Sequence, residues 1–440
     1  MKMKQRYLDT IVNNEAKEYA MYTVENRAIP SLMDGLKPVQ RFFIHVALEM
    51  AKGDKDKFHK LASIAGQVAD AGYHHGEASA QEAGALMANT WNNNLALLDG
   101  QGNFGSRLVQ EAAASRYIFC RISDNFRKIY KDIEICPRHK DAEHKPPRFY
   151  LPIIPTVLLN GVRGIATGYS TRILPHSFES IVECTKLAIE GNLTNKEPLV
   201  EFPKFKGTII TTAKGYELHG KYDMIGRNTL YISEIPYKWD RASYVEHLDE
   251  MEAKGWITYE DDCSSNGFGF KVKLKKEFKL GDNPDDTIMK EFALIEKVSQ
   301  FIVVVDENGK LNASLTKASD VINYFVQVRM KYIDERISYN KEKSNELFML
   351  AYAKAKFIKM IIDGELVISG KSRKELANEL STHSVLCNFV SQLLQMSVYH
   401  ITDDEYQKLK QQAIDAKKQY EYWCNTDSKT EYLKDLESLV

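Results

Sequence analysis

The sequence has no long uninterrupted apolar segment. Its most apolar stretch, residues 151–162, contains two prolines and an asparagine. It is shorter than the roughly 20 apolar residues that a helix needs to cross a bilayer. Residues 1–22 are polar and charged, unlike a secretory signal, which has an apolar centre. We therefore expect an intracellular protein.

Cysteine pairs and an excess of one charge are also missing. The six cysteines of the 440-residue chain are scattered and include no C-x-x-C pair, which argues against a disulfide framework or a zinc ribbon. Lys and Arg number 59 against 60 Asp and Glu, so a histone-like basic protein is excluded, while a locally basic groove is not. With 44% hydrophobic and 27% charged residues, the composition is typical of a globular protein with about two to four domains.

The sequence contains no complete nucleotide-binding loop. Gly364 to Ser372 has five residues between its glycines, where a phosphate loop has about four. Gly100–Gly105 fits G-x-G-x-x-G, and residues 108–114 after it resemble a helix. The neighbouring sequence, however, lacks the βαβα alternation of a dinucleotide-binding fold. A nicotinamide-dependent dehydrogenase stays as an alternative at this point.

The first third of the sequence is rich in segments typical of helices. Residues 57–69 and 77–92 flank a glycine-containing turn, Gly72–Gly76. A helix, a tight turn and a second helix are the outline of a helix-turn-helix, whose second helix can enter a DNA groove. A plain pair of antiparallel helices gives the same pattern, so both alternatives stay open.

The middle third has short runs typical of strands, separated by turn residues. The expected fold of this region is a mixed α/β domain. We expect strands at Thr208–Thr212, Thr229–Ile235, Phe268–Leu274 and Phe301–Val305.

The last part of the sequence is typical of long helices. Apolar residues recur three and four positions apart within residues 326–337 and 406–423, and charged residues occupy the other faces. Such stripes favour an antiparallel coiled-coil arm, although a helical bundle would show the same spacing. Short helices are expected at the tip of the arm, at residues 372–380 and 384–394.

The dipeptide Arg116-Tyr117 follows a run of small residues in a locally basic region. A tyrosine hydroxyl with its ordinary pKa of about 10 is a poor nucleophile. An adjacent guanidinium can stabilise the phenolate and bind the phosphate that it attacks. Residues 101–150 contain ten Lys and Arg against six Asp and Glu, a local charge of +4. Such a surface binds phosphates without reading base sequence, although most such windows are simply solvated.

Further cations precede this region. Arg27, Lys37 and Arg41 are spaced through a segment in which prolines and a glycine fix the backbone, so that the cations can reach outward. His74 and His75 lie in the turn between the two expected helices. No cysteine or further histidine stands at ligand spacing, so we do not expect a zinc site.

Five motifs occur in a fixed order along the chain. They are Arg27-x-Ile-Pro with Asp34-Gly-Leu-Lys-Pro-x-Gln-Arg41, Tyr73-His-His-Gly-Glu77, Asn103-Phe-Gly105, Ala112-Ala-Ala-Ser-Arg-Tyr117, and Ile153-Ile-Pro-Thr-Val-Leu-Leu-Asn-Gly161 with Gly164-Ile-Ala-Thr-Gly168. This series resembles the DNA breakage-reunion subunit of the type IIA DNA topoisomerases, over essentially the whole chain. The adjacent histidines are similar to the eukaryotic form, and the short length is similar to the form found in T-even-type phages.

The resemblance implies a role for each matching residue. Tyr117 would attack a DNA phosphodiester and become linked to the 5′ phosphate, which conserves the energy of the broken bond. Ile165 would wedge between base pairs and bend the DNA. Cations would stabilise charge on the scissile phosphate, as an oxyanion hole does; they are Arg116, Arg27, Arg41 and His75. The remaining expected DNA contacts are Lys37, His74, Lys60 and Ser79.

The implied fold is multidomain α+β. It has a winged-helix cleavage domain at residues 1–145 and a mixed α/β tower domain at 146–317. Residues 318–440 would form a coiled-coil arm ending in a helical dimer gate at about 364–400. The expected self-complementary contact there is Val385–Val398. The tower motif Glu234-Ile-Pro-Tyr237 is expected to be structural.

The resemblance also implies partners and cofactors. The sequence has no ATPase pattern and no carboxylate cluster of the toprim kind, so a large partner subunit would bind ATP and hold most of the Mg²⁺. The substrate would be double-stranded DNA, the chain would form a homodimer, and no membrane would be involved. Because no room is left for a DNA-wrapping domain, we expect relaxation and decatenation without efficient negative supercoiling. The expected location is the cytoplasm or nucleoid of a phage host.

A catalytically silent DNA-binding protein is the main alternative. It would keep the helix-turn-helix and the basic surface but would have lost cleavage. Against it stands the presence of Arg116 and Tyr117 together with Arg27, Arg41 and His75, because binding alone needs no nucleophile.

Overall fold

The computed structural model describes residue 8 and residues 11–439, and it forms two compact units. The first unit runs to Arg329 and includes the chain end from Leu436, and the second is Met330–Asp435. The two domains expected before residue 318 thus lie within one unit, and the second unit begins later than the expected arm. No helix in the described ranges is long and apolar enough to cross a membrane.

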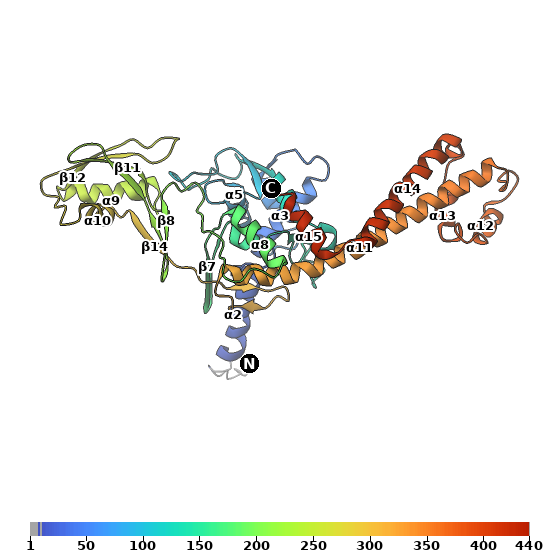
Figure 1. Ribbon diagram of the computed structural model, residues 1–440, viewed down its shortest axis with the longest axis horizontal. Helices are drawn as coiled ribbons and strands as arrows, with labels where there is room; N and C mark the ends of the chain where they lie inside the picture. The colour runs from blue at the N-terminus through green and yellow to red at the C-terminus, as the bar shows by residue number, and fades with distance from the viewer. Residues whose placement is uncertain (1–7, 9–10, 440) are drawn as a thin grey trace, which may run out of the picture. The chain divides into compact units, whose positions relative to one another are not determined.

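The first unit begins with an irregular helical stretch, of which α2 is labelled near the N-terminus in Figure 1. Helix α3 (Pro38–Met50) follows. It starts after Lys37 because proline suits the first helical position, and the Gln40 side chain accepts a hydrogen bond from the Lys37 amide at 2.9 Å. The N-terminal stretch consists of the π-helical η1 (Ile11–Ala16), α2 (Lys17–Thr23) and the π-helical η2 (Val24–Ala28).

Helix α3 packs with two further helices beside a small antiparallel sheet. The approach of α3 to α5 is close, because a Cβ at Gly84 would lie 2.5 Å from the Phe43 ring. This arrangement is consistent with the winged helix expected here. The helices are α4 (Leu61–Gly66) and α5 (Glu77–Ala88), and the strands, in sheet order, are β1 (His59–Lys60), β3 (Phe119–Ile122) and β2 (Leu98–Gln101).

Three expected helical segments differ in the structure. The helix expected from residue 57 begins at Leu61, because the two residues before it pair with β3. The next helix ends at Ala88, since the Asn89 side chain accepts a hydrogen bond from the Asn92 amide at 3.0 Å and turns the chain. Residues 108–114 form an irregular loop instead of a helix.

A hairpin and several short elements connect this region to the β-rich part. The hairpin consists of β6 (Val162–Ala166) and β7 (Tyr169–Ile173), and Ile165 pairs with Ser170. The remaining elements are α6 (Asp124–Ile129), β4 (Tyr130–Lys131), the 3₁₀ turn η3 (Ile133–Ile135), β5 (Leu151–Pro152), α7 (Thr156–Leu159) and α8 (Phe178–Ile189).

Two antiparallel sheets, ordered β14-β9-β8 and β10-β11-β13-β12, form the β-rich part. Helices α9 and α10 and the second sheet share one apolar core, in which Tyr244 and Phe270 are fully buried. The elements are β8 (Thr208–Thr212), β9 (Gly215–His219), β10 (Lys221–Met224), β11 (Thr229–Glu234), α9 (Arg241–Ala253), β12 (Ile257–Asp261), β13 (Phe270–Leu274), α10 (Pro284–Glu291), β14 (Ile295–Val298), β15 (Val304–Val305) and β16 (Leu311–Asn312).

Three of the four expected strands are present. The expected strand at Thr208–Thr212 is β8, and β11 and β13 depart from their expected bounds by only one or two residues at one end. The fourth, expected at Phe301–Val305, is a strand only at β15. Phe301 instead makes an isolated bridge with Arg172 of β7.

The second unit has two long helices and a group of short ones. Helix α11 (Ala318–Ile362) begins within the first unit, and α14 (Asp403–Asn425) returns along its outer part (Figure 1). Ile358, near the end of α11, packs with Leu409, near the start of α14, so the two helices are antiparallel. The other elements are α12 (Arg373–Ser381), η4 (Cys387–Phe389), α13 (Val390–Leu393) and η5 (Val398–His400). Helix α15 (Ser428–Glu437) begins in the second unit, and its last residues belong to the first.

Apolar residues within the expected dimer contact, Val385–Val398, have a local packing role. Leu386 and Leu393 are buried in one cluster with Phe357 of α11. Tyr399, next to this segment, is 92% exposed. The local core therefore accounts for the two leucines, and Tyr399 is a large side chain that this region presents to solvent.

Candidate functional site

Tyr117 is exposed at the end of an irregular loop, just before strand β3. Its side chain is 65% exposed, and its amide donates a hydrogen bond to the Ala114 carbonyl at 2.9 Å in a tight turn. The guanidinium of Arg116 lies over the Tyr117 ring, 4.7 Å from its centroid. An exposed tyrosine with a guanidinium over its ring brings a nucleophile and a phosphate-binding cation together.

Neighbouring elements hold this turn from two sides. The Ala62 amide, in the first turn of α4, donates a hydrogen bond to the Ser115 carbonyl at 3.3 Å. The Ser115 hydroxyl donates to Gln81 Oε1 of α5 at 2.7 Å. The exposed Lys60 pairs with Phe119 across β1 and β3, so it lies at the same edge. The backbone of the turn is thus fixed while its two functional side chains remain outside.

The glycine-rich loop before this turn is folded onto itself. Strand β2, which leads into the loop, belongs to an antiparallel sheet, and no helix follows the loop. Gly102 and Gly105 have φ angles of 113° and 81°. A Cβ at Gly105 would lie 2.8 Å from the Gln110 carbonyl oxygen. The glycines therefore allow the loop to turn tightly and pack on itself, and the dinucleotide-binding interpretation is wrong.

The structure places Arg41 inside the protein, where it is only 6% exposed. Its Nε donates a hydrogen bond to Asp34 Oδ2 at 2.7 Å, and its Nη2 donates to Asp34 Oδ1 and to the Leu36 carbonyl, both at 3.0 Å. Burial lowers the pKa of Arg41, but the Asp34 charge and the hydrogen bond to Asp34, with smaller contributions from Tyr150 and Tyr130, together raise it overall. This guanidinium fixes the turn from Asp34 to Leu36, and its expected contact with a phosphate stays a prediction.

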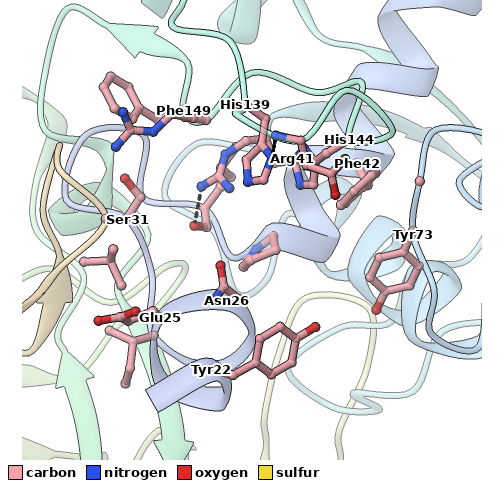
Figure 2. Close-up of a pocket in the computed structure, with 18 of the residues that line it drawn as sticks. Tyr22, Glu25, Asn26, Ser31, Arg41, Phe42, Tyr73, His139, His144 and Phe149 are labelled. Atoms are coloured by element: carbon pink, nitrogen blue, oxygen red, sulfur yellow. Dashed lines mark hydrogen bonds between the residues drawn. The ribbon is translucent and has the colours of Figure 1, made fainter. Parts of the chain in front are cut away.

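A cavity of about 290 Å³ lies beside Arg41. His74 and His75 are exposed residues on its lining. The imidazole of His144 stacks on that of His139 at 3.9 Å, and burial, followed by the His139 charge, lowers the pKa of His144 to about 4. His144 is therefore neutral near pH 7. Figure 2 shows the residues that surround the cavity, among them Tyr22, Glu25, Asn26, Phe42, Tyr73 and Phe149.

Tyr73 connects this cavity to the other expected DNA contacts. Its ring lies 5.2 Å from that of His75. Burial raises the pKa of Tyr73, and a hydrogen bond with Ser79 and the charge of Arg27 oppose the shift. His75, Ser79 and Arg27 thus gather around one tyrosine.

Ile165 lies on β6 and is 87% exposed, so the alternative of a buried core residue is wrong. Two contacts hold its hairpin. Lys37 Nζ donates a hydrogen bond to the Arg163 carbonyl at 2.8 Å, and burial lowers the pKa of Lys37. A Cβ at Gly164 would lie 2.3 Å from the Ala28 carbonyl oxygen, so β6 packs directly on the end of η2. Lys37, expected as a DNA contact, here binds the hairpin.

Two arginines that the sequence motifs do not mark lie on the hairpin of Ile165. Arg163 and Arg172 pair across β6 and β7, and Arg163 is exposed. Side chains two positions apart on a strand share a face, so Arg163 and Ile165 share one face of β6. Strand periodicity around Ile165 would have found Arg163.

The described residues contain no group of three or more His, Cys, Asp or Glu side chains that could hold a metal ion. The donor set that Mg²⁺ prefers is a cluster of oxygen ligands. The described part of this chain does not fit that ion, and none of the chemistry below is assigned to a metal held by it.

A protein-family model for the A-type subunit of DNA gyrase/topoisomerase IV matches residues 27–438. The chain is 56% identical over 443 aligned residues to the DNA topoisomerase medium subunit of Enterobacteria phage T4, covering 100% of both chains. It is 32% identical over 388 residues to DNA topoisomerase 2 of Plasmodium falciparum, covering 84% of this chain and 27% of that protein.

The fold is similar to a crystal structure of the Plasmodium falciparum topoisomerase II DNA-binding, cleavage and re-ligation domain. The TM-score is 0.87 at 28% sequence identity, and the match covers 97% of this chain and 63% of that chain. The chain therefore spans the whole of the phage relative but only 27% of the Plasmodium topoisomerase 2.

Proposed function

The chain belongs to the DNA gyrase/topoisomerase IV family, in its A-type subunit branch, and on that premise we propose that Tyr117 is the residue with which it breaks and reseals DNA. The chain is a DNA-cleaving and religating subunit of a type II DNA topoisomerase. One observation carries the proposal. The exposed Tyr117 has the Arg116 guanidinium 4.7 Å from its ring centroid, in a turn that two helices hold.

The reaction exchanges one phosphodiester bond for another. The Tyr117 hydroxyl oxygen attacks the phosphorus and gives its proton to solvent. The bond from phosphorus to the 3′ oxygen breaks, and that oxygen leaves and takes up a proton. Attack by the 3′ hydroxyl on the 5′ phosphotyrosine reverses each change. Arg116 stabilises the added negative charge on the phosphate, as preorganised donors do at an oxyanion.

The helices and sheet around Tyr117 would dock the DNA as a winged helix. Helix α5 would be the recognition helix, with Ser79 in its first turn. Arg27, His75 and Lys60 would contact phosphates, which positions the duplex without reading sequence. Arg41 supports the fold beneath them through its Asp34 pair.

The exposed Ile165 would enter the base stack. Unstacking costs a few kcal/mol per step and is offset by the additional protein contacts of bent DNA. The exposed Arg163 on the same strand would contact the adjacent backbone, and the Lys37 hydrogen bond would hold the hairpin in place.

Assembly forms the remaining part of the proposal. A large partner subunit would supply ATP hydrolysis and hold Mg²⁺, in keeping with the name medium subunit of the phage T4 relative. Two copies of this chain would meet through the tip of the second unit and bring two Tyr117 residues to one duplex. The complex would act inside the host cell, relaxing and decatenating DNA.

A covalent-trap experiment tests the nucleophile. The chain is mixed with its partner subunit, Mg²⁺ and supercoiled plasmid, and detergent is added. We expect linear DNA with protein on its 5′ ends for the wild type and for Tyr352→Phe, a matched exposed tyrosine on α11. Tyr117→Phe should bind DNA but give no linked DNA.

Two other results would redirect the assignment. Linked DNA with Tyr117→Phe would place the nucleophile elsewhere. No linked DNA with any variant, while binding is intact, would favour the catalytically silent DNA-binding protein.

A further inference from the structure

Arg107 lies in the loop that leads to Tyr117, yet its side chain binds residues of the β-rich part and is only 7% exposed. We propose that Arg107 is a positioning residue that fixes the cleavage loop to the β-rich part of the first unit. The inference rests on the proposed role of Tyr117. By this proposal, the β-rich part helps to determine the position of the Tyr117 hydroxyl.

The guanidinium of Arg107 is held by the last residue of β11 and the residue that follows it. Its Nη2 donates a hydrogen bond to the Ile235 carbonyl at 3.1 Å and lies 3.4 Å from Glu234 Oε1. Three aromatic rings surround it, with centroids at 4.5, 5.2 and 5.8 Å, and they belong to Tyr237, Phe268 and Phe205. The motif Glu234–Tyr237, which was expected to be structural, thus binds a side chain of the cleavage loop.

The buried pair of Arg107 and Glu234 stabilises the fold less than well-packed apolar side chains could. Arg107 Nε and Nη1 have no hydrogen-bond partner among the described residues, and burial lowers the pKa of Arg107. Burial also raises the pKa of Glu234, although the Arg107 charge and the amides of Lys206 and Ile235 oppose the shift. Apolar side chains often replace such pairs without loss of stability. A defined position for the loop is what the charged pair adds.

The residue after Arg107 reinforces the attachment. The Leu108 carbonyl accepts a hydrogen bond from the Arg241 amide, at the start of α9, at 3.1 Å. The Leu108 side chain packs against the core that β11, β13 and α9 share. On the other side, the Tyr237 hydroxyl donates to the Trp91 carbonyl at 2.7 Å, and Trp91 Nε1 donates to the Phe104 carbonyl at 3.1 Å.

The loop is therefore fixed at both ends by different elements. Its start is held by the β-rich part at Arg107, and its end is held by α4 and α5 at Ser115. If the sheets shift relative to these helices, the backbone between Arg107 and Ser115, immediately before Tyr117, must change its conformation. Loosening the Arg107 end should leave DNA binding intact and misplace the attacking oxygen, and a misplacement of about 1 Å can cost about 100-fold in rate.

A double-mutant cycle separates positioning from stability. Arg107→Met alone leaves Glu234 buried without its cation, whereas Arg107→Met with Glu234→Gln removes both charges. We expect the double variant to regain the melting temperature of the wild type, to bind DNA within about twofold, and to form covalent complex about 10- to 100-fold more slowly. Arg107→Lys keeps a cation among the rings and should recover part of the rate. Arg227→Met, an exposed arginine in the turn before β11, is the matched control.

Hydrogen exchange gives a second readout that does not depend on cleavage. The Ala113 amide donates to the Asn103 carbonyl at 2.9 Å within the loop. In the double variant, free of DNA, this amide should exchange about tenfold faster or more, while the amides in the last two turns of α9, away from its Arg241 end, are unchanged. A double variant with wild-type exchange in the loop, or with wild-type cleavage, would overturn the proposal. Absence of covalent complex in the wild type with faster loop exchange in the variant would count against Tyr117 and not against the attachment.

Discussion

Among single residues, Arg116 has the most direct predicted effect on the chemistry. Removing one preorganised charge donor from a developing oxyanion costs about 100- to 1,000-fold in rate. We expect Arg116→Ala to slow covalent-complex formation by that amount without a change in melting temperature, because Arg116 is exposed. Arg116→Lys keeps the charge but not the planar fork and should fall between. The exposed control Arg227→Ala should behave as the wild type, and normal cleavage by Arg116→Ala would show that its role is structural.

Arg41 is predicted to act on stability instead. Arg41→Met leaves Asp34 buried without its cation, which should lower the free energy of unfolding by about 3–5 kcal/mol, measured by urea denaturation. Replacing Asp34 by Asn in the same chain should restore part of the loss. Unchanged stability in Arg41→Met, with impaired cleavage, would instead favour a direct phosphate contact.

His176 makes stability dependent on pH. Burial lowers its pKa from 6.5 to about 4 in the folded chain, so folding favours the neutral ring. The stability that the neutral His176 ring contributes is fully present above pH 6.5 and is lost as the pH falls towards 4. The loss should approach about 3 kcal/mol, measured as the difference in urea unfolding between pH 7.5 and pH 4. His176→Gln should remove that part of the pH dependence, and an identical profile for the variant would rule the assignment out.

Among the elements, the β6–β7 hairpin is predicted to bend DNA through one side chain. Ile165→Ala should reduce the bend, measured by energy transfer between dyes at the two ends of a duplex, and should slow cleavage. The melting temperature should not change because the side chain is 87% exposed. Leu199→Ala, at another exposed aliphatic residue, is the matched control. A full bend with Ile165→Ala would assign bending to other residues.

The sequence predicted elements well where the signal is local. Strand β8 and the long helix α11 follow from residue type and periodicity over neighbouring positions. The start of α4 does not, because its preceding residues pair with β3, far along the sequence. Residues 108–114 have good helix formers, but Leu108 is bound to α9 and the glycines before it fold the loop tightly, so long-range contacts override local preference.

The sequence motifs predict a set of candidate site residues but not their geometry. They single out Tyr117 and Arg116 because the chemistry needs those residue types, and the catalytic roles of both stay predictions. No local rule says that Ile165 is exposed or that Arg41 is buried, since both depend on which segments pack against them. The role of Arg107 could not be predicted from the sequence, because an isolated arginine in a loop forms no motif. Its aromatic neighbours, such as Tyr237, are distant in sequence and come close only in the fold.

For the whole molecule, the proposed homodimer can be tested at one side chain. Tyr399 is 92% exposed at the tip region, so Tyr399→Glu should leave the local core of Leu386 and Leu393 intact. If the tip is the contact between copies, the charge should convert dimers to monomers at micromolar concentration in analytical ultracentrifugation. Tyr352→Glu, on α11, should stay dimeric. A tight dimer in Tyr399→Glu would remove this part of the tip from the contact.

Positions 164 and 165, neighbours on β6, should tolerate different substitutions under selection. Position 164 has no space for a methyl group, because the Ala28 carbonyl occupies it at 2.3 Å from a Cβ. Position 165 faces open solvent, so the folded chain alone tolerates many side chains there. In a saturation library, selection for folding should keep glycine at 164 and leave 165 free, and only selection for activity should restrict 165. Position 164 is then constrained by packing within the chain, and position 165, by the proposed function, is constrained by contact with DNA.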